Sequence, residues 1–376
     1  MRVLIISSEF PPGPGGVGTH AYELARHLER VGNSVVVVCS QNYSSKEVID
    51  NFNKELRFTL ITHEQKTNYL VTIFSRLSLV LRAIRTHKPE VVIASGSNSI
   101  WVGAIYRYLL GSFKLVVVAH GGELTFSSKI RRSLTRWGCR LADHIISVSN
   151  YTKQYIPDQL PSKITVIHNG ANHFLLQDKK QQRDLKDKYG YSGKHIFLTV
   201  GSVSERKGQD IVMKALRTVI QQYPDTIYLM AGRSNNIEFF KTVARQEGVE
   251  NNVVFLGSVN NEFLVDLYNM TDLYVIASRH SSDGDFEGFG ISVIEAALCS
   301  VPAVVTRDSG LVEAIEEGVT GFSVPSENPE ELAKAIIHLM DDGLRINMGI
   351  AARKRAEQNF TWEKVALSYH KVLTSL

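Results

Sequence analysis

The chain has 376 residues, of which 44% are hydrophobic and 21% are charged, which is typical of a globular protein with two domains and excludes disordered and membrane-spanning classes. Its first apolar run, Val3–Ile6, is short and predicts a buried strand, not a signal peptide, so we expect a cytoplasmic protein. The net charge of +4 is uneven: residues 1–172 hold 20 Lys and Arg against 11 Asp and Glu, and the remainder holds 22 against 27. The first part is therefore expected to face something anionic.

Short runs rich in valine and isoleucine alternate with helical patterns along the first part of the chain. The sequence predicts a strand at Arg2–Ile6 and a helix at His20–Arg30, which ends at Gly32. Further strands are expected at Ser34–Cys39, Glu90–Ala94, Leu115–Ala119, His144–Val148 and Ile164–Ile167. Strands that are apolar on both faces and alternate with helices are typical of parallel sheets.

The second part of the chain repeats this alternation. Strands are expected at His195–Val200, Thr226–Ala231, Val253–Leu256, Leu273–Ile276 and Ala303–Thr306, with helices at Gln209–Gln222 and Gly290–Leu298. We therefore predict an α/β protein of two Rossmann-like, doubly wound parallel-sheet domains that face a cleft. The boundary falls in the polar stretch Asn169–Asp178, which gives an N-terminal domain at 1–172, a C-terminal domain at 173–358 and a terminal helix at 359–376. Ligands of such sheets bind at the carboxyl ends of the strands.

Two glycine-containing segments follow strands in the first domain. The segment Pro11–His20 includes Gly15 and Gly16, and the helix after it offers free N–H groups to a phosphate. It matches neither the dinucleotide fingerprint nor the P-loop, and a tight structural turn is the alternative. His120 is followed by two glycines, so its imidazole is expected to reach a ligand, although a core histidine is the alternative.

Two further segments of this kind lie in the second domain. Arg206 and Lys207 come before Gly208 and a helix, where they can neutralise a diphosphate or form an ordinary solvated pair. The segment Glu287–Glu295 is the strongest signal, because its glycines are expected to open a helix that points N–H groups at a ligand. On a helix its two carboxylates would lie ~12 Å apart. Retaining glycosidases hold theirs ~5–5.5 Å apart, so this pair suits a long ligand gripped at both ends.

The tripeptide Asp283–Asp285 has the Asp-x-Asp pattern that binds a divalent cation in one class of glycosyltransferases. We interpret it as a loop without metal, because Arg206, Lys207 and a helix N-terminus are available to neutralise phosphate. The sequence contains no nucleic-acid-binding motif.

Taken together, these segments resemble family 4 of the retaining glycosyltransferases, which have the GT-B fold. The resemblance covers nearly the whole chain. Its motifs are the glycine-rich loop, the domain junction Val166–Gly170, the turn Arg206–Gly208, the Glu-x7-Glu segment Glu287–Glu295 and the closing segment Phe360–Trp362.

The resemblance implies a nucleotide-diphosphate sugar as donor, with no cofactor and no metal. It assigns donor-binding roles to Gly15, Gly16, Gly201, Gly288, Phe289, Gly290, Ile291 and Glu295, and catalytic roles to His120, Arg206, Lys207 and Glu287. Glu295 would bind the ribose, Glu287 the sugar, and Arg206 and Lys207 the diphosphate. Many relatives have Arg where this chain has Ser202, and phosphate contact at Ser309 is only weakly implied.

The implied reaction keeps the donor's α configuration and builds a polysaccharide or glycolipid on a glycan or lipid-linked acceptor. Two basic stretches of the first domain, Arg76–Lys88 and Lys129–Arg140, favour a peripheral position on the inner face of an anionic membrane, with a solvated helix face as the alternative. Two other functions remain open, a nucleotide-sugar 2-epimerase and a catalytically inactive donor-binding subunit.

Overall fold

The computed structural model describes the chain except for Pro14, Tyr43 and residues 64–68, 158–162 and 173–178. The described residues divide into two compact units. Unit 1 consists of Met1–Gly170 with Trp362–Leu376, and unit 2 consists of Ala171–Thr361. No helix among the described residues is both long and apolar enough to cross a bilayer.

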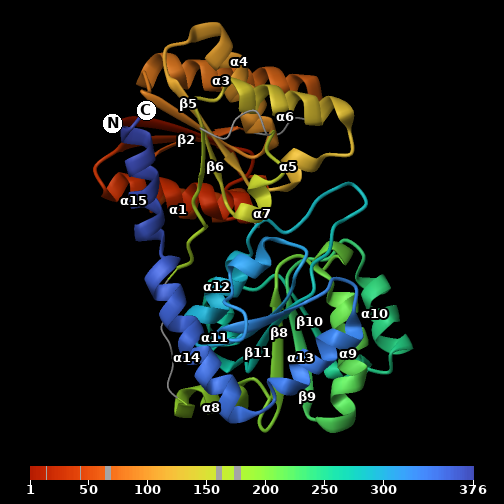
Figure 1. Cartoon of the computed structure of the whole chain (residues 1–376). Coiled ribbons are helices and arrows are strands. Elements are labelled where there is room, and N and C mark those ends of the chain that lie inside the picture. Colours follow the sequence, from red (N-terminus) through yellow and green to blue (C-terminus); the bar gives the residue numbers. More distant parts are fainter. Residues whose placement is uncertain (14, 43, 64–68, 158–162, 173–178) are drawn as a thin grey trace. The chain divides into compact units, whose positions relative to one another are not determined.

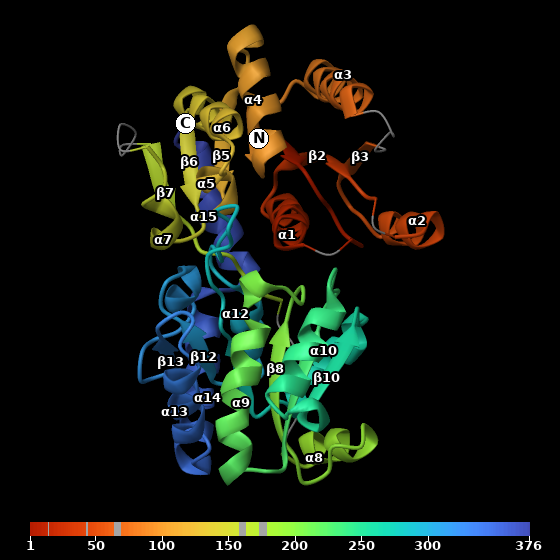
Figure 2. The same ribbon diagram turned by 90° about the vertical axis from the view of Figure 1, so that its right-hand side faces the viewer.

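Unit 1 is built on a parallel sheet of seven strands in the order β3-β2-β1-β4-β5-β6-β7. The strands are β1 (Arg2–Ser7), β2 (Ser34–Ser40), β3 (Thr59–His63), β4 (Val91–Ser95), β5 (Lys114–Ala119), β6 (His144–Ser147) and β7 (Ile164–Val166). Figure 2 shows β3 and β7 at opposite edges of this sheet. The central strands are buried on both faces, as their apolar sequences predict, whereas the edge strand β3 is only partly buried.

Helices cover both faces of this sheet. They are α1 (Gly16–Arg30), α2 (Lys46–Lys54), α3 (Tyr69–His87), α4 (Ser97–Leu110), α5 (Gly122–Thr125), α6 (Lys129–Leu141), α7 (Asn150–Lys153) and α15 (Trp362–Thr374). Figure 1 shows α3, α4 and α6 on one face and α1 beside α15 on the other. Helix α1 begins at Gly16, so the end of the segment that we expected to be a loop forms its first turn.

Unit 2 has a parallel sheet of six strands in the order β10-β9-β8-β11-β12-β13. Its strands are β8 (His195–Val200), β9 (Thr226–Ala231), β10 (Val253–Gly257), β11 (Leu273–Ile276), β12 (Ala303–Thr306) and β13 (Gly321–Val324). Its helices are α8 (Lys179–Lys188), α9 (Gln209–Gln222), α10 (Ile237–Gln246), α11 (Asn261–Met270), α12 (Ile291–Leu298), α13 (Pro329–His338) and α14 (Asp342–Asn359), with short 3-10 helices η2 (Glu205–Lys207), η3 (Glu250–Asn252) and η4 (Gly310–Glu313). Helices α9, α10 and α13 lie on one face, and α11, α12 and α14 on the other (Figure 1).

The strand order of each sheet reverses at one place, and ligands of doubly wound sheets bind at that switch point. In unit 1 it falls between β1 and β4, and in unit 2 between β8 and β11. The glycine-rich segment follows β1, the Arg206–Lys207 turn follows β8, and Glu287 follows β11. The candidate residues of each unit therefore lie on the connections that leave its switch point, or, for His120, one strand away from it.

Candidate active site

The turn after β8 brings two cations of unit 2 onto one carboxylate. Lys207 Nζ lies 2.6 Å from Glu287 Oε2, and Arg206 Nη1 lies 3.0 Å from the same oxygen. Lys207 is nearly buried, and Gly201, at the end of β8, leaves room for it, since a Cβ at Gly201 would lie 3.3 Å from Lys207 Cε. The expected grouping of Arg206, Lys207 and Glu287 is thus present in the structure.

These contacts fix the charge state of Glu287. Burial alone would raise the pKa of its carboxyl, but Lys207 and Arg206 outweigh burial and lower the pKa to about 2. In turn, Glu287 and Asp285 raise the pKa of Arg206 against the effect of burial. Glu287 is therefore an anion at neutral pH and cannot donate a proton as a general acid.

The helix expected at Gly290–Leu298 is confirmed within one residue, but it does not extend back to Glu287. Helix α12 begins at Ile291, with Gly290 as its N-cap at φ 90, so Glu287 and Gly288 lie before it. The expected separation of ~12 Å assumed the helical rise over all eight residues, and this assumption is wrong because only the part from Ile291 onward is helical. The turn is held by the Gly310 N–H, which donates to Glu287 O at 2.8 Å, and Gly310 lies so close to Gly288 O that a Cβ would overlap it.

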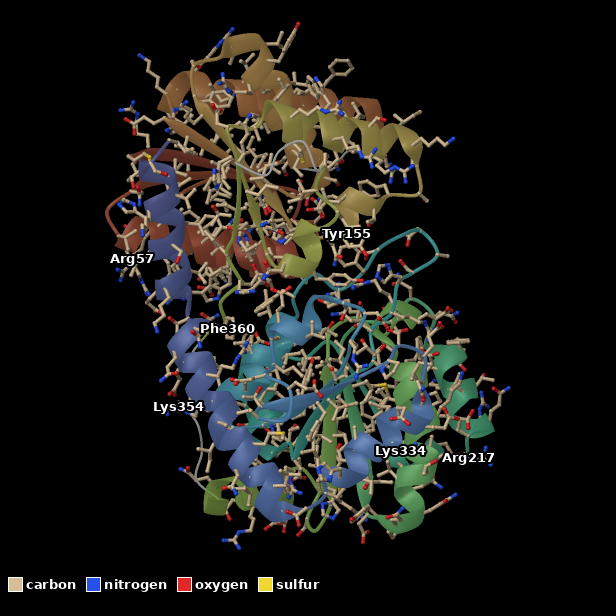
Figure 3. The ribbon with its side chains drawn as sticks, viewed as in Figure 1. Arg57, Tyr155, Arg217, Lys334, Lys354 and Phe360 are labelled. Atoms are coloured by element: carbon tan, nitrogen blue, oxygen red, sulfur yellow. The ribbon has the colours of Figure 1, made fainter. Side chains whose placement is uncertain are left out.

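The turn still leads into the N-terminus of α12, close in sequence to the carboxylate that binds the two cations. Ile291 and Ser292 open α12, and their N–H groups have no carbonyl one turn earlier in the helix. Phe289 is buried, with its ring centroid 5.5 Å from that of Phe360, which is labelled in Figure 3. Phe289 and Gly290 thus set the geometry at the start of α12.

Glu295 takes part in a different set of contacts. It lies on the second turn of α12 and accepts a hydrogen bond from Tyr268 Oη at 2.6 Å. Tyr274 Oη donates to Ser292 Oγ at 2.7 Å on the same helix. The sequence did not reveal these two tyrosines, because they are ordinary apolar-pattern positions on α11 and β11 and only the packing of α12 brings them to the site.

The Asp-x-Asp segment is tied to the cation turn. Asp285 Oδ2 lies 3.0 Å from Arg206 Nε, and Asp283 accepts from Ser281 Oγ at 2.5 Å. Among the described residues, no three His, Cys, Asp or Glu side chains gather as they would around a metal ion. At the Ser202 position the backbone oxygen accepts from Gln209, and the buried Ser309 donates to Thr306 O at 3.1 Å, which is a turn contact.

In unit 1 the glycine-rich segment leaves open space at one position. A Cβ at Gly15, the N-cap of α1 at φ 142, would overlap the carboxylate of Glu9. A Cβ at Gly16 would meet nothing within 4 Å. The backbone conformation therefore favours glycine at Gly15, because φ 142 is strained for other residues, whereas Gly16 leaves the first turn of α1 accessible.

His120 lies at the carboxyl end of β5 in unit 1. Its Nε2 is 2.9 Å from Ser95 Oγ at the end of β4, and its backbone N–H donates to Glu123. Burial lowers the pKa of His120 to about 4, so the imidazole is neutral at pH 7. The candidate residues thus divide between Gly15, Gly16 and His120 in unit 1 and the others in unit 2.

Two family models match the chain. Residues 14–173 match the model described as Glycosyltransferase Family 4, and residues 180–355 match Glycosyl transferases group 1. The two matches leave few residues of the chain uncovered, and they confirm the resemblance read from the motifs. The chain belongs to the family 4 glycosyltransferases.

Two curated relatives align with nearly the full length of the chain. A GDP-mannose-dependent alpha-(1-6)-phosphatidylinositol monomannoside mannosyltransferase of Mycolicibacterium smegmatis is 26% identical over 368 residues, covering 96% of this chain and 95% of the relative. The GDP-mannose-dependent monoacylated alpha-(1-6)-phosphatidylinositol monomannoside mannosyltransferase of Corynebacterium glutamicum is 25% identical over 392 residues, covering 100% and 98%.

Solved structures confirm the fold. A crystal structure of Anabaena Alr3699/HepE in complex with UDP and glucose matches with a TM-score of 0.81 at 22% identity, covering all of both chains. WaaG, a glycosyltransferase involved in lipopolysaccharide biosynthesis, matches with a TM-score of 0.72 at 17% identity, covering 97% of this chain and 98% of WaaG. Together with the two parallel sheets, these matches show the GT-B fold.

Proposed function

We propose that this glycosyltransferase moves a sugar from a nucleotide-diphosphate donor to a glycan or lipid-linked acceptor, with retention of the α configuration, in polysaccharide or glycolipid synthesis. The observation that carries the proposal is the convergence of Lys207 and Arg206 on Glu287, beside the N-terminus of α12 and at the switch point of the sheet. Two fixed cations and a helix N-terminus match the charge of a diphosphate.

In the proposed reaction the bond between the sugar C1 and the donor phosphate oxygen breaks, and a bond from C1 to the acceptor oxygen forms on the same face. The acceptor proton goes to the departing phosphate oxygen. Arg206, Lys207 and the α12 amides stabilise the negative charge that develops on this leaving group. The charge neutralisation comes from protein cations, and for this reason we propose a metal-independent reaction.

The remaining residues bind and orient the donor in this proposal. Glu287, an anion paired with Lys207, accepts hydrogen bonds from sugar hydroxyls, and Glu295 accepts from ribose hydroxyls. In unit 1, the neutral His120 contacts the sugar, and Gly15 and Gly16 approach the phosphates. Holding the reacting groups in place supplies much of the rate enhancement in such reactions.

The test is a transfer assay with several donors. GDP-mannose is named by the mannosyltransferase relatives and UDP by the Anabaena structure, so GDP-mannose, UDP-glucose and ADP-glucose are each incubated with and without a lipid extract as acceptor. We expect nucleotide release that depends on the acceptor, and an α linkage in the product by NMR. A β linkage would overturn retention, and a new sugar epimer formed without acceptor would identify an epimerase instead.

We also propose that an anionic membrane surface presents the acceptor to the layer formed by α3, α4 and α6. These three helices contain nine Lys and Arg and no Asp or Glu. Of the twelve large apolar side chains exposed among the described residues, seven belong to them: Ile73, Phe74, Tyr108, Leu109, Leu110, Ile130 and Leu134. Arg107 pairs with Asp143, but exposed apolar side chains among the other cations suit the headgroup region of an anionic bilayer.

The three helices form one continuous surface. Tyr106 Oη of α4 donates to Leu77 O of α3 at 2.8 Å, and the rings of Tyr108 and Trp137 join α4 to α6 at 6.5 Å. Tyr108, Leu109 and Ile130 are 72%, 65% and 75% exposed. In the free protein these apolar side chains remain in contact with water, and insertion into a membrane would bury them.

Flotation with vesicles tests this surface. The protein is expected to float with vesicles that contain phosphatidylglycerol, but not with pure phosphatidylcholine, and to lose flotation in Y108S/L109S and R136E/R140E. One matched control is I350S, which replaces an exposed apolar residue of α14. The other controls are charge reversals of Arg217 and Lys334 on unit 2, both labelled in Figure 3. Equal loss in the controls, or no flotation at low salt, would overturn the proposal.

A further inference from the structure

A cluster of rings within unit 1 joins the C-terminal helix to His120. His20, on the second turn of α1, is 1% exposed, and its Nε2 lies 3.0 Å from Tyr369 Oη of α15. The centroid of the His20 ring is 5.0 Å from that of His120, with the rings nearly perpendicular, and 5.7 Å from that of Trp362. His20 thus lies between the terminal helix and the histidine at the end of β5.

Both imidazoles of this cluster are neutral at pH 7. Burial, and then the proximity of His120, lower the pKa of His20 well below its ordinary value, and burial lowers that of His120 to about 4. The contact between them is therefore a packing contact of two uncharged rings in edge-to-face geometry, the arrangement that aromatic pairs favour.

If His20 only filled space, it would be an energetically unfavourable residue at this position. Its Nδ1 is buried and has no hydrogen-bond partner among the described residues. An unsatisfied buried polar atom costs about 1–3 kcal/mol, which an apolar side chain would avoid. What offsets this cost is a fixed orientation. The planar His20 ring is held by Tyr369 at one edge and packs against the His120 ring, whose plane it thereby fixes.

We infer that His20 is a positioning residue for His120 and that Tyr369 fixes the orientation of His20. Helix α15 thereby supports the sugar-binding histidine, although it follows unit 2 in the chain. The inference rests on the proposed function in one respect, namely that His120 contacts the donor sugar.

Two other polar contacts attach α15 to α1 and to the loop that follows α1, without touching His20. Asn33 Nδ2 lies 3.2 Å from His370 Nδ1, and His27 Nε2 lies 3.3 Å from Glu363 Oε1. Removing either contact weakens the docking of α15 and leaves the link from Tyr369 through His20 to His120 in place. These contacts provide matched controls that separate positioning from simple docking.

The experiment compares Y369F with E363Q and H370Q in the full chain, with His120→Ala as the reference for loss of the site. Y369F is expected to lower kcat ~10-fold, because small displacements of a catalytic group reduce rates strongly. Its donor KM is expected to stay close to that of the wild type. Its melting temperature is expected to fall, because the buried His20 Nε2 loses its partner, and E363Q and H370Q are expected to keep the wild-type kcat.

A second pair of variants tests the orientation itself. H20Q keeps a polar atom near the position of Nε2 and is expected to retain more activity than H20L. Because Tyr369 acts through His20, the double variant H20L/Y369F is expected to be no slower than H20L alone. An additive loss would contradict that order.

The outcomes distinguish the role of His120 in the reaction from its positioning by His20 and Tyr369. A normal rate in H120A would overturn the proposed role of His120. Loss of activity in H120A with wild-type kcat in both Y369F and H20L would overturn only the positioning link. An equal fall of kcat in Y369F, E363Q and H370Q would mean that α15 docking alone matters.

Discussion

At the scale of single residues, the ion cluster of Lys207, Arg206 and Glu287 is the feature on which the chemistry depends. Replacing Lys207 by Met is expected to lower kcat about 10²–10³-fold, the usual effect of removing one group that stabilises transition-state charge. Steady-state kinetics at saturating donor measure this. The control is K334M, an exposed lysine of α13 paired with Glu331, which should leave kcat unchanged.

The lowered pKa values of His20 and His120 predict how stability depends on pH. Their pKa values are lowered in the folded state, so below an ordinary value near 6.5 the unfolded chain binds protons that the folded chain does not. Stability is therefore complete above that pH and falls as the pH drops toward about 4, where His120 titrates. Urea unfolding at several pH values measures the slope, and H20Q should flatten it; an unchanged slope would contradict the buried neutral state.

Residue types at strand ends predicted the grouping of Arg206, Lys207 and Glu287, because parallel strands bring their carboxyl ends to one edge of the sheet. Tyr268, Tyr369 and His20 could not be assigned in this way. Their positions read as ordinary apolar or helical positions, and their contacts arise from helices that are distant in sequence.

At the scale of elements, the connection from β11 to α12 places the candidate groups. The alternation of apolar runs predicted most strands within a residue or two, but not β3 or β13. Both are sheet-edge strands, and their partly buried, mixed sequences lack a continuous apolar run. The helix expected at Gly290–Leu298 begins at Ile291, within one residue, but Glu287 and Gly288 belong to the turn before it, so the segment Glu287–Glu295 is only partly helical.

That turn depends on glycine at Gly310. Its Cβ position overlaps Gly288 O, so G310A is expected to destabilise unit 2 by about 1–3 kcal/mol, the usual cost of overpacking. Denaturant unfolding gives the value. G343A is the matched control, because its new Cβ meets only Asp341 Oδ1 at 3.4 Å near the start of α14, where alanine favours the helix. Similar stability of G310A and the wild type would mean that the turn relaxes freely.

At the scale of the whole molecule, each sheet carries its candidate residues at its own switch point, or one strand from it in the case of His120. The chain passes between the two units twice, at Gly170–Ala171 and at Thr361–Trp362. The fold could be predicted from sequence because both sheets have strongly apolar central strands. The division of the chain places α15 in unit 1, where it packs against α1 and supports the rings around His20.

The central claim is that unit 2 recognises a diphosphate through Lys207 and Arg206. Calorimetric titration of the wild type and K207M with a nucleoside monophosphate and the matching diphosphate, GMP and GDP or UMP and UDP, tests it most directly. The account predicts that the wild type binds the diphosphate at least 10-fold more tightly than the monophosphate, about 1.4 kcal/mol, and that K207M loses most of this difference. Equal affinities in the wild type, or an undiminished difference in K207M, would contradict it.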